Sequence, residues 1–503
     1  MVRNDGEDFA RRARSHGMRR IGLLLFPLLF LSPARAAIPP ASFDLAAIRD
    51  THTLETEVIQ GWQPAKGQPG ILQKLVTITV CEWWPGQKVR IPVTFCVPTK
   101  GGPCRNVIVA NAGLQPRPAL PHGAMLKLLQ DHQVGIVLAG MGTIDAMEPA
   151  GKLHLGMKEQ LLKTKDPRFT PAWIWGMSDM RALTAAAAEL EHFRPVRVLA
   201  TGGSKRGVGA AICGIHDDRF TAILPVVAPI TASPGGAYVR GSALKDEDAL
   251  NAAFLADLAP GPNPLGLPAT ARQALLERDQ RRRDQSLTAE ECSAAGWTAE
   301  EMTEMNDAAW STCLIARHLD EVRSRSLTFF YHNGTNDNVC PGLAQLGREH
   351  PDFPAYLLPG GQHGGPQASG FTLQTPSQRA ADENLRAFAM HHFFHSRPLP
   401  KTPAVTCQRG DAGIQVTVTF AEGSEPNENT VSWCSDRHPP YTLAAEYDRW
   451  ESAPLTRTAP GVFTATLPAE KGAVHIVTTH TDQTARLPFH FSSPYLIVEP
   501  EKK

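Results

Sequence analysis

Short, continuously apolar runs recur through the middle of the chain, and stretches of helical pattern lie between or after them. Such runs are typical of strands buried on both faces of a sheet, and their alternation with helices predicts parallel crossover connections. Residues 71–97 instead alternate apolar and polar positions, as antiparallel strands do. The pattern therefore predicts an α/β fold whose mostly parallel sheet begins with antiparallel strands. The later strands are expected at 106–113, 134–140, 196–203, 220–227, 326–334 and 354–361, and helices at roughly 178–193, 204–216, 340–349 and 376–395.

The long interval between the expected strands at 220–227 and 326–334 has no strand pattern. It contains two helix starts of the capping-box type, Thr288 with Glu291 and Thr298 with Glu301. We expect a helical insertion over about 233–325. It serves either as a lid or substrate wall over the carboxyl edge of the sheet, or as a structural elaboration away from any site.

The C-terminal part of the chain has a different period. Residues 402–503 contain short runs that repeat every second residue, such as "GIQVTVTF" and "AVHIVTTH", separated by Gly, Pro, Asn and Asp. This pattern predicts a small β-sandwich. We therefore expect an α/β domain at 37–400 and a β-sandwich domain at 402–503, which packs or binds beside the first and has no evident catalytic cluster of its own.

The N-terminus has the pattern of an export signal. Two arginines follow Met18, then the apolar run "IGLLLFPLLFL", and then "SPARAAIPP", in which Ala34 and Ala36 form an A-x-A cleavage site. We expect residues 1–36 to be a signal peptide region, with Met18 as a candidate start, and the mature chain to be periplasmic or secreted. The alternative is a signal anchor with a cytoplasmic tail, for which the apolar run is short.

Charge and cysteine content narrow the expected partners. Fifty basic and fifty acidic residues balance, so no global field attracts nucleic acid or an anionic membrane, and neither is expected as a partner. Nine cysteines fit an oxidising compartment. We expect local pairs within the group Cys81, Cys96 and Cys104, between Cys292 and Cys313, and between Cys407 and Cys434. We expect Cys213 to be a small buried thiol. No pair has C-x-x-C spacing, so no metal site is expected. No cofactor is expected either.

A serine stands where a strand is expected to end and a helix to begin. In "VRVLATGGSKRGVGAA" the apolar run leads through two glycines to Ser204. On such a sharp turn a serine points its hydroxyl out at the carboxyl edge of the sheet, where a helix N-terminus favours an oxyanion. We expect Gly202, Gly203 and Gly207 to allow the turn, although Arg206 stands where the common motif has its second glycine. The alternative is an ordinary turn with Ser204 as the helix N-cap.

Two later stretches supply the groups that would activate this serine. "YHNGTNDNVCPG" places Asp337 just after one expected strand, and "LLPGGQHGG" places His363 just after the next. A serine hydroxyl becomes a strong nucleophile when a histidine takes its proton, and the histidine needs a carboxylate to hold its tautomer. The order Ser204, Asp337, His363 is the one that α/β-hydrolases use. The sequence therefore predicts an α/β-hydrolase fold with these three catalytic residues.

An oxyanion formed at this serine needs N–H donors. We expect one from the backbone of Lys205, directly after the serine, and a second from the "NAGL" turn at Ala112, Gly113 or Leu114. The Lys205 side chain either bears part of the developing charge, attracts an acidic acyl group, or is solvated surface. Arg206 is expected to brace the turn.

On these motifs the chain resembles the PhoPQ-activated pathogenicity-related proteins. The resemblance rests on "TGGSKRG", "WGMSDMRALTAAAAEL", "NGTNDNV" with "PGGQH", and "NTVSWCSDRHPPYTLAAEYDRW". It covers most of the mature chain and implies an α/β-hydrolase domain with a β-sandwich in an exported bacterial protein. The stretch "GGSKRGVGA" around Ser204 is also similar to the "G-C-S-R-x-G-K-G-A" stretch of glucuronoyl esterases, in which an arginine after the serine assists the oxyanion. Lys205 corresponds to that arginine, while Gly203 and Val208 replace the cysteine and the lysine.

The function that follows is that of a serine hydrolase. We expect an exported carboxylic ester hydrolase that works through an acyl-enzyme on a small-molecule or glycan-linked ester. Amide or peptide hydrolysis is the alternative chemistry, and a non-catalytic, virulence-associated binding protein on the same fold is the alternative class. The acyl group, the leaving group and the oligomeric state stay open.

Overall fold

The computed structural model describes residues 40–147, 153–232, 268–363 and 376–500, together with Ile38 and the backbone of 239–240, and leaves out 423, 436, 441, 443 and 484–486 within these ranges. The expected signal peptide region 1–36 and the part of the expected insertion at 241–267 lie outside the described residues. None of the helices in the described ranges combines the length and the apolar character that a membrane crossing requires.

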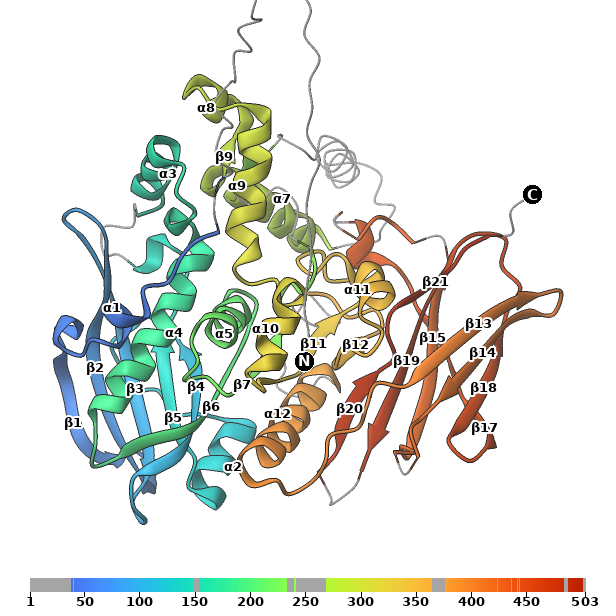
Figure 1. Cartoon of the computed structure of the whole chain (residues 1–503), viewed down its shortest axis with the longest axis horizontal. Coiled ribbons are helices and arrows are strands. Elements are labelled where there is room, and N and C mark those ends of the chain that lie inside the picture. The colour runs from blue at the N-terminus through green and yellow to red at the C-terminus, as the bar shows by residue number, and fades with distance from the viewer. Residues whose placement is uncertain are drawn as a thin grey trace, which may run out of the picture. The chain divides into compact units, whose positions relative to one another are not determined.

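A ten-stranded sheet forms the centre of the described chain (Figure 1). Its strands lie in the order β1-β2-β3-β5-β4-β6-β7-β11-β12, and β10 pairs with β7. The pairs from β1 to β5 are antiparallel, and all later neighbours in this order are parallel. The predicted α/β fold, with antiparallel strands at the start of a mostly parallel sheet, is confirmed. The bounds are β1 (Glu57–Ala65), β2 (Gln68–Trp84), β3 (Gln87–Pro98), β4 (Cys104–Ala112), β5 (Gly135–Gly140), β6 (Phe193–Gly203), β7 (Ala222–Val226), β10 (Thr328–Phe329), β11 (Tyr331–Gly334) and β12 (Ala355–Leu358).

Helices cover both faces of this sheet because its central strands are apolar on both sides. In β4, Val107 and Val109 pack into the core cluster that contains α4 and α5. Ile108 and Ala110 point the other way, into the cluster that contains α2 and α12. The continuous apolar runs of the sequence thus correspond to strands buried from two sides. The bounds are α1 (Leu45–Arg49), η1 (His52–Leu54), α2 (Gly123–His132), η2 (Asp145–Met147), α3 (Leu153–Thr164), η3 (Pro167–Phe169), α4 (Pro171–Ala188), α5 (Lys205–His216), α11 (Leu343–Glu349) and α12 (Pro376–Phe394).

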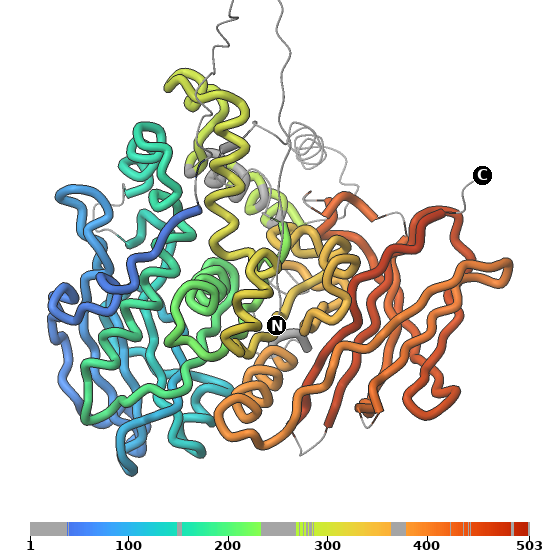
Figure 2. The backbone as a smooth tube through the Cα atoms, in the orientation of Figure 1, coloured from blue at the N-terminus to red at the C-terminus, as the bar shows by residue number. Residues whose placement is uncertain are grey.

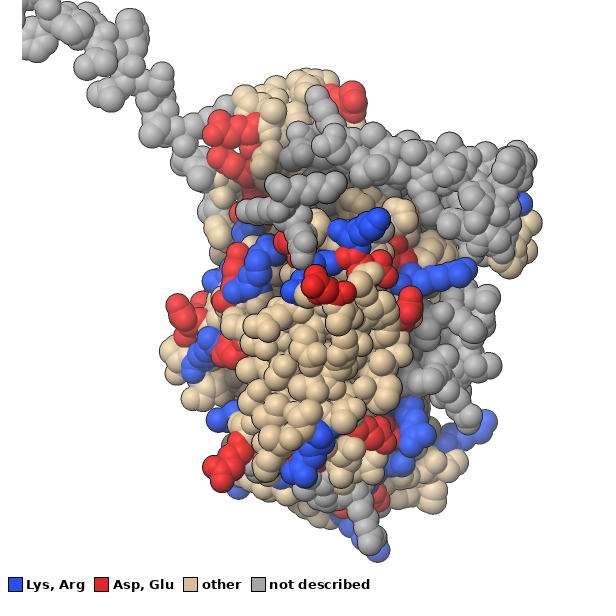
Figure 3. Space-filling model, turned by 90° about the vertical axis from the view of Figure 1, so that its right-hand side faces the viewer, with Lys and Arg blue, Asp and Glu red and all other residues tan. Residues whose placement is uncertain are grey.

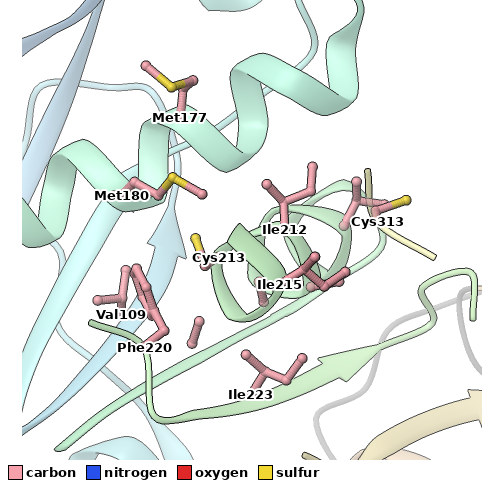
Figure 4. Close-up of a cluster of buried hydrophobic side chains, with 14 of the residues drawn as sticks. Val109, Met177, Met180, Ile212, Cys213, Ile215, Phe220, Ile223 and Cys313 are labelled. Atoms are coloured by element: carbon pink, nitrogen blue, oxygen red, sulfur yellow. The ribbon is translucent and has the colours of Figure 1, made fainter. Parts of the chain in front are cut away.

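A dense core fixes α5, the helix that follows Ser204, against α4 (Figure 4). Met177 and Met180 of α4 lie over Ile212 and Cys213 of α5 in this core. A Cβ atom at Gly176 would lie only 2.3 Å from Ile212 Cγ2, so the two helices approach closely. Cys213 is a fully buried thiol, as expected.

The described part of the expected insertion is mainly helical, and both predicted capping boxes form, at the starts of α8 and α9. These two helices are attached to α3. Lys158 Nζ lies 2.9 Å from Glu291 Oε1, and Trp297 Nε1 donates to the Leu162 carbonyl at 3.1 Å. Because α3 follows the carboxyl end of β5, the insertion is tied to the edge of the sheet at which β6 delivers Ser204. The bounds are β8 (Val239–Arg240), α7 (Ala269–Gln285), β9 (Leu287–Thr288), α8 (Ala289–Ala294), α9 (Ala299–Ser311), η4 (Ile315–His318) and α10 (Leu319–Ser324).

Two antiparallel sheets follow α12 (Figure 2). One has the order β13-β14-β18-β17, and the other has the order β16-β15-β19-β20 with β21 paired to β19. Ile414, Val416 and Val418 of β14 are fully buried in a core shared with the second sheet, as in a β-sandwich. The bounds are β13 (Ala404–Gly410), β14 (Gly413–Thr419), β15 (Glu428–Ser435), η5 (Ala444–Tyr447), β16 (Glu451–Pro454), β17 (Thr456–Ala459), β18 (Val462–Leu467), β19 (Val474–Asp482), β20 (Phe489–Ser492) and β21 (Leu496–Val498).

The alternate residues of β14, such as Gln415 and Thr417, face away from this core and pair with further Thr and Gln residues of β13 and β18. Figure 3 looks onto this side of the molecule and shows a broad area without Lys, Arg, Asp or Glu. The period of two in the sequence therefore separates a buried apolar face from an uncharged polar one.

The expected disulfide between Cys407 and Cys434 is wrong for this structure. Cys407 on β13 and Cys434 on β15 are both thiols. Burial raises the pKa of the Cys407 thiol to about 11. The other expected local pairs do not form either, since each of these cysteines is a thiol: Cys81, Cys96, Cys104, Cys292 and Cys313.

Candidate active site

Ser204 lies on the turn between β6 and α5, in a backbone conformation that residues other than glycine rarely adopt. Its φ is 58° and its ψ is −127°, and such a conformation costs on the order of 1–3 kcal/mol. Two hydrogen bonds hold it: the Ser204 N–H donates to the Val226 carbonyl at 3.0 Å, and the Val208 N–H donates to the Ser204 carbonyl at 2.9 Å. The Ser204 side chain makes no capping hydrogen bond to α5, so the N-cap alternative does not hold. The turn is instead typical of a nucleophile elbow.

Two of the three glycines expected to allow this turn are required by close contacts. A Cβ atom at Gly202 would lie 2.6 Å from Arg206 Cβ, and one at Gly207 would lie 2.8 Å from the Val226 carbonyl oxygen. At Gly203 a Cβ atom would meet nothing within 4 Å. The expectation is therefore correct for Gly202 and Gly207 and wrong for Gly203, where the chain has room for a side chain.

His363 and Asp337 meet Ser204 in one hydrogen-bonded chain. His363 follows β12, and its Nε2 lies 2.7 Å from Ser204 Oγ. Its Nδ1 lies 3.0 Å from each carboxylate oxygen of Asp337, which lies in the loop after β11. An ionised carboxylate can only accept, so the ring proton belongs on Nδ1, and Nε2 is left to accept the serine proton. The structure thus brings together the three residues that the sequence singled out.

The Asp337 carboxylate is fully buried and is held by further donors. The Val339 N–H donates to Oδ1 at 2.9 Å, and Cys340 Sγ donates to Oδ2 at 3.2 Å. Burial, and then the negative charge of Asp337, raise the pKa of the Cys340 thiol well above its ordinary value, so this thiol stays a donor. Sequence reasoning missed this role of Cys340. The only feature of the sequence that points to it is the position of Cys340 three residues after Asp337.

The turn after β4 is connected to the elbow through Arg206. Arg206 Nη2 donates to the Ala112 carbonyl at 3.5 Å, which agrees with its expected role of bracing the turn. A Cβ atom at Gly113 would meet nothing within 4 Å, and Leu114 packs against the core. Ala112 is therefore joined to the elbow, whereas no hydrogen bond among the described residues links Gly113 or Leu114 to Ser204.

Lys205 is the first residue of α5, so its backbone N–H has no acceptor within the helix. Its side chain is partly buried, and no carboxylate in the described part of the chain forms an ion pair with it. Burial, and then repulsion from Arg206, lower the pKa of its ammonium group. A partly desolvated cation beside another cation favours an anion in its vicinity. An oxyanion or a substrate carboxylate near Lys205 would supply this negative charge.

Sequence reasoning missed a buried carboxyl group beneath the elbow. Asp179 of α4 is 1% exposed, and Asn111 Nδ2 donates to its Oδ1 at 2.8 Å. A Cβ atom at Gly209 would lie 2.9 Å from Asp179 Oδ2, so the carboxyl group lies against α5. Burial raises the pKa of Asp179 to about 8, against the opposing effects of the Asn111 hydrogen bond and the Arg206 charge. The available signal was an aspartate inside the largely apolar helix "GMSDMRALTAAAA".

No protein-family model and no curated protein matches this chain. Among solved structures, a puromycin-hydrolyzing peptidase of Mycobacterium tuberculosis is 15% identical over 64% of this chain, with a TM-score of 0.34, and the chain spans only 40% of that peptidase. An acetyl xylan esterase from Paenibacillus sp. R4 is 13% identical over 71% of this chain and 97% of its own, with a TM-score of 0.36. A glucuronoyl esterase from Solibacter usitatus is 15% identical over 59% of this chain and 71% of its own, with a TM-score of 0.32.

These likenesses are weak, and the fold is identified by the strand order and the elbow. The chain has the α/β-hydrolase fold.

Proposed function

We propose that this protein is a serine hydrolase that cleaves carboxylic esters through an acyl-enzyme. Ser204 is the nucleophile, His363 the general base and acid, and Asp337 the carboxylate that orients the imidazole. The observation that carries the proposal is the 2.7 Å approach of His363 Nε2 to Ser204 Oγ, while Nδ1 of the same ring rests on a buried carboxylate. A structural serine needs neither this partner nor the strained backbone of the elbow.

In the first half-reaction Ser204 Oγ attacks the ester carbonyl carbon while its proton passes to His363 Nε2. The carbonyl oxygen becomes an oxyanion, and collapse of the tetrahedral intermediate breaks the bond to the alcohol oxygen, which takes the proton from His363. Water then attacks the acyl-enzyme, gives a proton to His363, and releases the acid as Ser204 is restored. Asp337 stabilises the imidazolium in both halves without taking its proton.

We place the oxyanion near the N-terminus of α5. The Lys205 N–H is the first donor, because it is free of intrahelical bonding and follows the nucleophile directly. The Ala112–Leu114 turn is the source of the second, supported by the Arg206 contact that ties Ala112 to the elbow. The Lys205 ammonium assists either the oxyanion or the binding of an acidic acyl group.

Hydrolysis of an aryl ester by purified protein tests the proposal. Ser204→Ala and His363→Ala should each lose nearly all activity, and the double variant should lose little more, because the two residues act as one unit. His52→Ala, at an exposed position, is the matched histidine control and should retain full activity. An active Ser204→Ala variant would contradict the assignment.

Amide or peptide hydrolysis is the alternative chemistry, and a matched ester and anilide of the same acyl group separate the two. A higher kcat/KM on the anilide than on the ester would show that the protein is a peptidase or amidase and not an esterase.

We also propose, on the sequence motifs alone, that the protein is exported and related to the PhoPQ-activated pathogenicity-related proteins. A mature N-terminus at Ala37 in protein recovered from a bacterial periplasm or culture fluid would support export, and an uncleaved N-terminus would contradict it.

A further inference from the structure

The C-terminal sheets contact the strand that leads to His363. β12 is the last strand of the ten-stranded sheet, and Ser492 of β20 bonds to its outer edge. The Ser492 Oγ accepts from the Leu357 N–H at 3.0 Å and donates to the Ala355 carbonyl at 3.1 Å. The core that contains α12 also continues into these sheets. The C-terminal sheets and the ten-stranded sheet are therefore packed together at β12, the strand that precedes His363.

A segment of the C-terminal part also binds the loop that carries Asp337. We call the described residues of 437–450 the clamp segment. Asn336, directly before Asp337, is 1% exposed. Its Nδ2 donates to the Asp448 carbonyl at 2.7 Å, and its Oδ1 accepts from Trp450 Nε1 at 2.8 Å. Both polar atoms of the Asn336 side chain are thus bound by the clamp segment.

Arg437 organises this segment. Its guanidinium donates to the Thr335 carbonyl and, at 3.2 Å, to Asp448 Oδ2. Thr335 belongs to the loop of residues 335–342 that carries Asp337, which we call the acid loop. The guanidinium carbon also lies 5.8 Å from the centre of the Trp450 ring. The Arg437 and Asp448 side chains are only 4% and 5% exposed. This buried ion pair joins two residues of the clamp segment and so holds the segment together, while the Arg437 donation to the Thr335 carbonyl attaches the segment to the loop.

The clamp segment also contacts residues 359–363 after β12, which include His363 and which we call the histidine loop. Gln362, directly before His363, donates through Nε2 to the Glu446 carbonyl at 2.6 Å. The acid loop and the histidine loop are also bonded to each other, since the Asn336 N–H donates to the Gly361 carbonyl at 2.9 Å. The residues immediately before Asp337 and before His363 are therefore both held by the C-terminal part of the chain.

We infer that the clamp segment positions Asp337 and His363 for catalysis. The C-terminal part of the chain therefore supports the geometry of the active site. This inference rests on the proposed serine hydrolase function. Trp450 and Arg437 are positioning residues, because they act on the acid loop and not on the reacting atoms. Catalysis is sensitive to such positioning: a misplacement of about 1 Å can cost roughly a hundredfold in rate.

Trp450→Phe in the full-length protein tests the inference. It removes the donor to Asn336 Oδ1 and keeps an aromatic ring beside Arg437. We expect kcat for an aryl ester to fall about tenfold with KM nearly unchanged, because the histidine is less well placed while substrate contacts remain. The rate constant for labelling of Ser204 by a fluorophosphonate should fall in parallel. The end-point of labelling counts competent molecules, so unfolded protein does not enter the rate.

Trp433→Phe is the matched control. Trp433 lies in the core of the same part of the chain, on β15, and is 7% exposed. This variant should lower stability but keep the rate per labelled molecule. Wild-type rates per labelled molecule in Trp450→Phe, or an equal loss in both variants, would overturn the inference while leaving the hydrolase intact. Absence of labelling in the wild-type protein would overturn the proposed function and the inference with it.

Discussion

Gly207→Ala tests whether the elbow depends on close contact between α5 and the ends of β6 and β7. A Cβ atom at this position would lie 2.8 Å from the Val226 carbonyl oxygen, 2.9 Å from the Gly202 carbonyl oxygen and 3.1 Å from Ala228 Cβ. Two of these three atoms belong to the backbone. The helix or the strand ends must therefore move to accommodate a methyl group.

Two effects of this substitution oppose each other. In a helix interior, alanine is favoured over glycine by about 1 kcal/mol. Overpacking of a well-packed site costs about 1–3 kcal/mol, and contacts with backbone atoms place Gly207 at the upper end. We expect a net loss of about 1–2 kcal/mol in the free energy of unfolding. Activity should also fall, because the Val226 carbonyl that would be displaced accepts the Ser204 N–H.

Urea denaturation and ester hydrolysis, measured on the same preparations, check both expectations. Gly203→Ala is the matched control for stability, since its Cβ atom would meet nothing within 4 Å. Its free energy of unfolding should stay within about 0.5 kcal/mol of the wild type. If Gly207→Ala were as stable as Gly203→Ala and kept the wild-type kcat, close packing at the elbow would not be what holds Ser204 in place.

Three further substitutions probe charges around the site. If the Lys205 ammonium supports the oxyanion, Lys205→Met should lower kcat more than it raises KM, with a loss of transition-state stabilisation of a few kcal/mol at most. If the ammonium instead binds an acidic acyl group, the substitution should raise KM selectively for carboxylate-bearing esters. Unchanged kinetics on both neutral and anionic esters would make Lys205 solvated surface. Asp337→Asn should keep the fold and lose activity through the wrong histidine tautomer, so a fully active variant with normal circular dichroism would move the acid elsewhere. Asp179 has a pKa of about 8 in the folded protein against about 3.9 unfolded, so the stability it contributes is fully present below about pH 4 and is lost as the pH rises through 8. Asp179→Asn should flatten this part of the pH dependence of urea midpoints between pH 4 and 9, and an unchanged pH dependence would show that Asp179 is not the group responsible.

Ser204, Asp337 and His363 could be predicted from the sequence because each lies next to a strand that the local pattern of residues identifies. An apolar run that ends in two glycines before Ser204 specifies a strand, a turn and a helix. Asp337 and His363 each follow a strand, and parallel strands bring their carboxyl ends to one edge of the sheet. The strand β1 (Glu57–Ala65), by contrast, was not expected. It is largely exposed at the edge of the sheet, so its sequence lacks the apolar alternation that marks buried strands.

Contacts between distant segments left no comparable signal. The pairs Asn111 with Asp179 and Asn336 with Trp450 join residues on different elements through side-chain geometry alone. Sequence proximity was also misleading for Cys407 and Cys434, which are both thiols. The segment that contains Trp450 is a motif in the sequence, but its contact with the acid loop follows only from the packing of the C-terminal sheets.

The most direct test of the account is covalent labelling of the purified protein with a fluorophosphonate, followed by mass mapping of the modified residue. The reagent reacts with a serine whose hydroxyl is activated, and it requires no knowledge of the substrate. The account predicts modification at Ser204 in the wild-type protein and little or none in His363→Ala, whose serine lacks the base at 2.7 Å. Labelling of another serine, or equal labelling of Ser204 in both proteins, would contradict it.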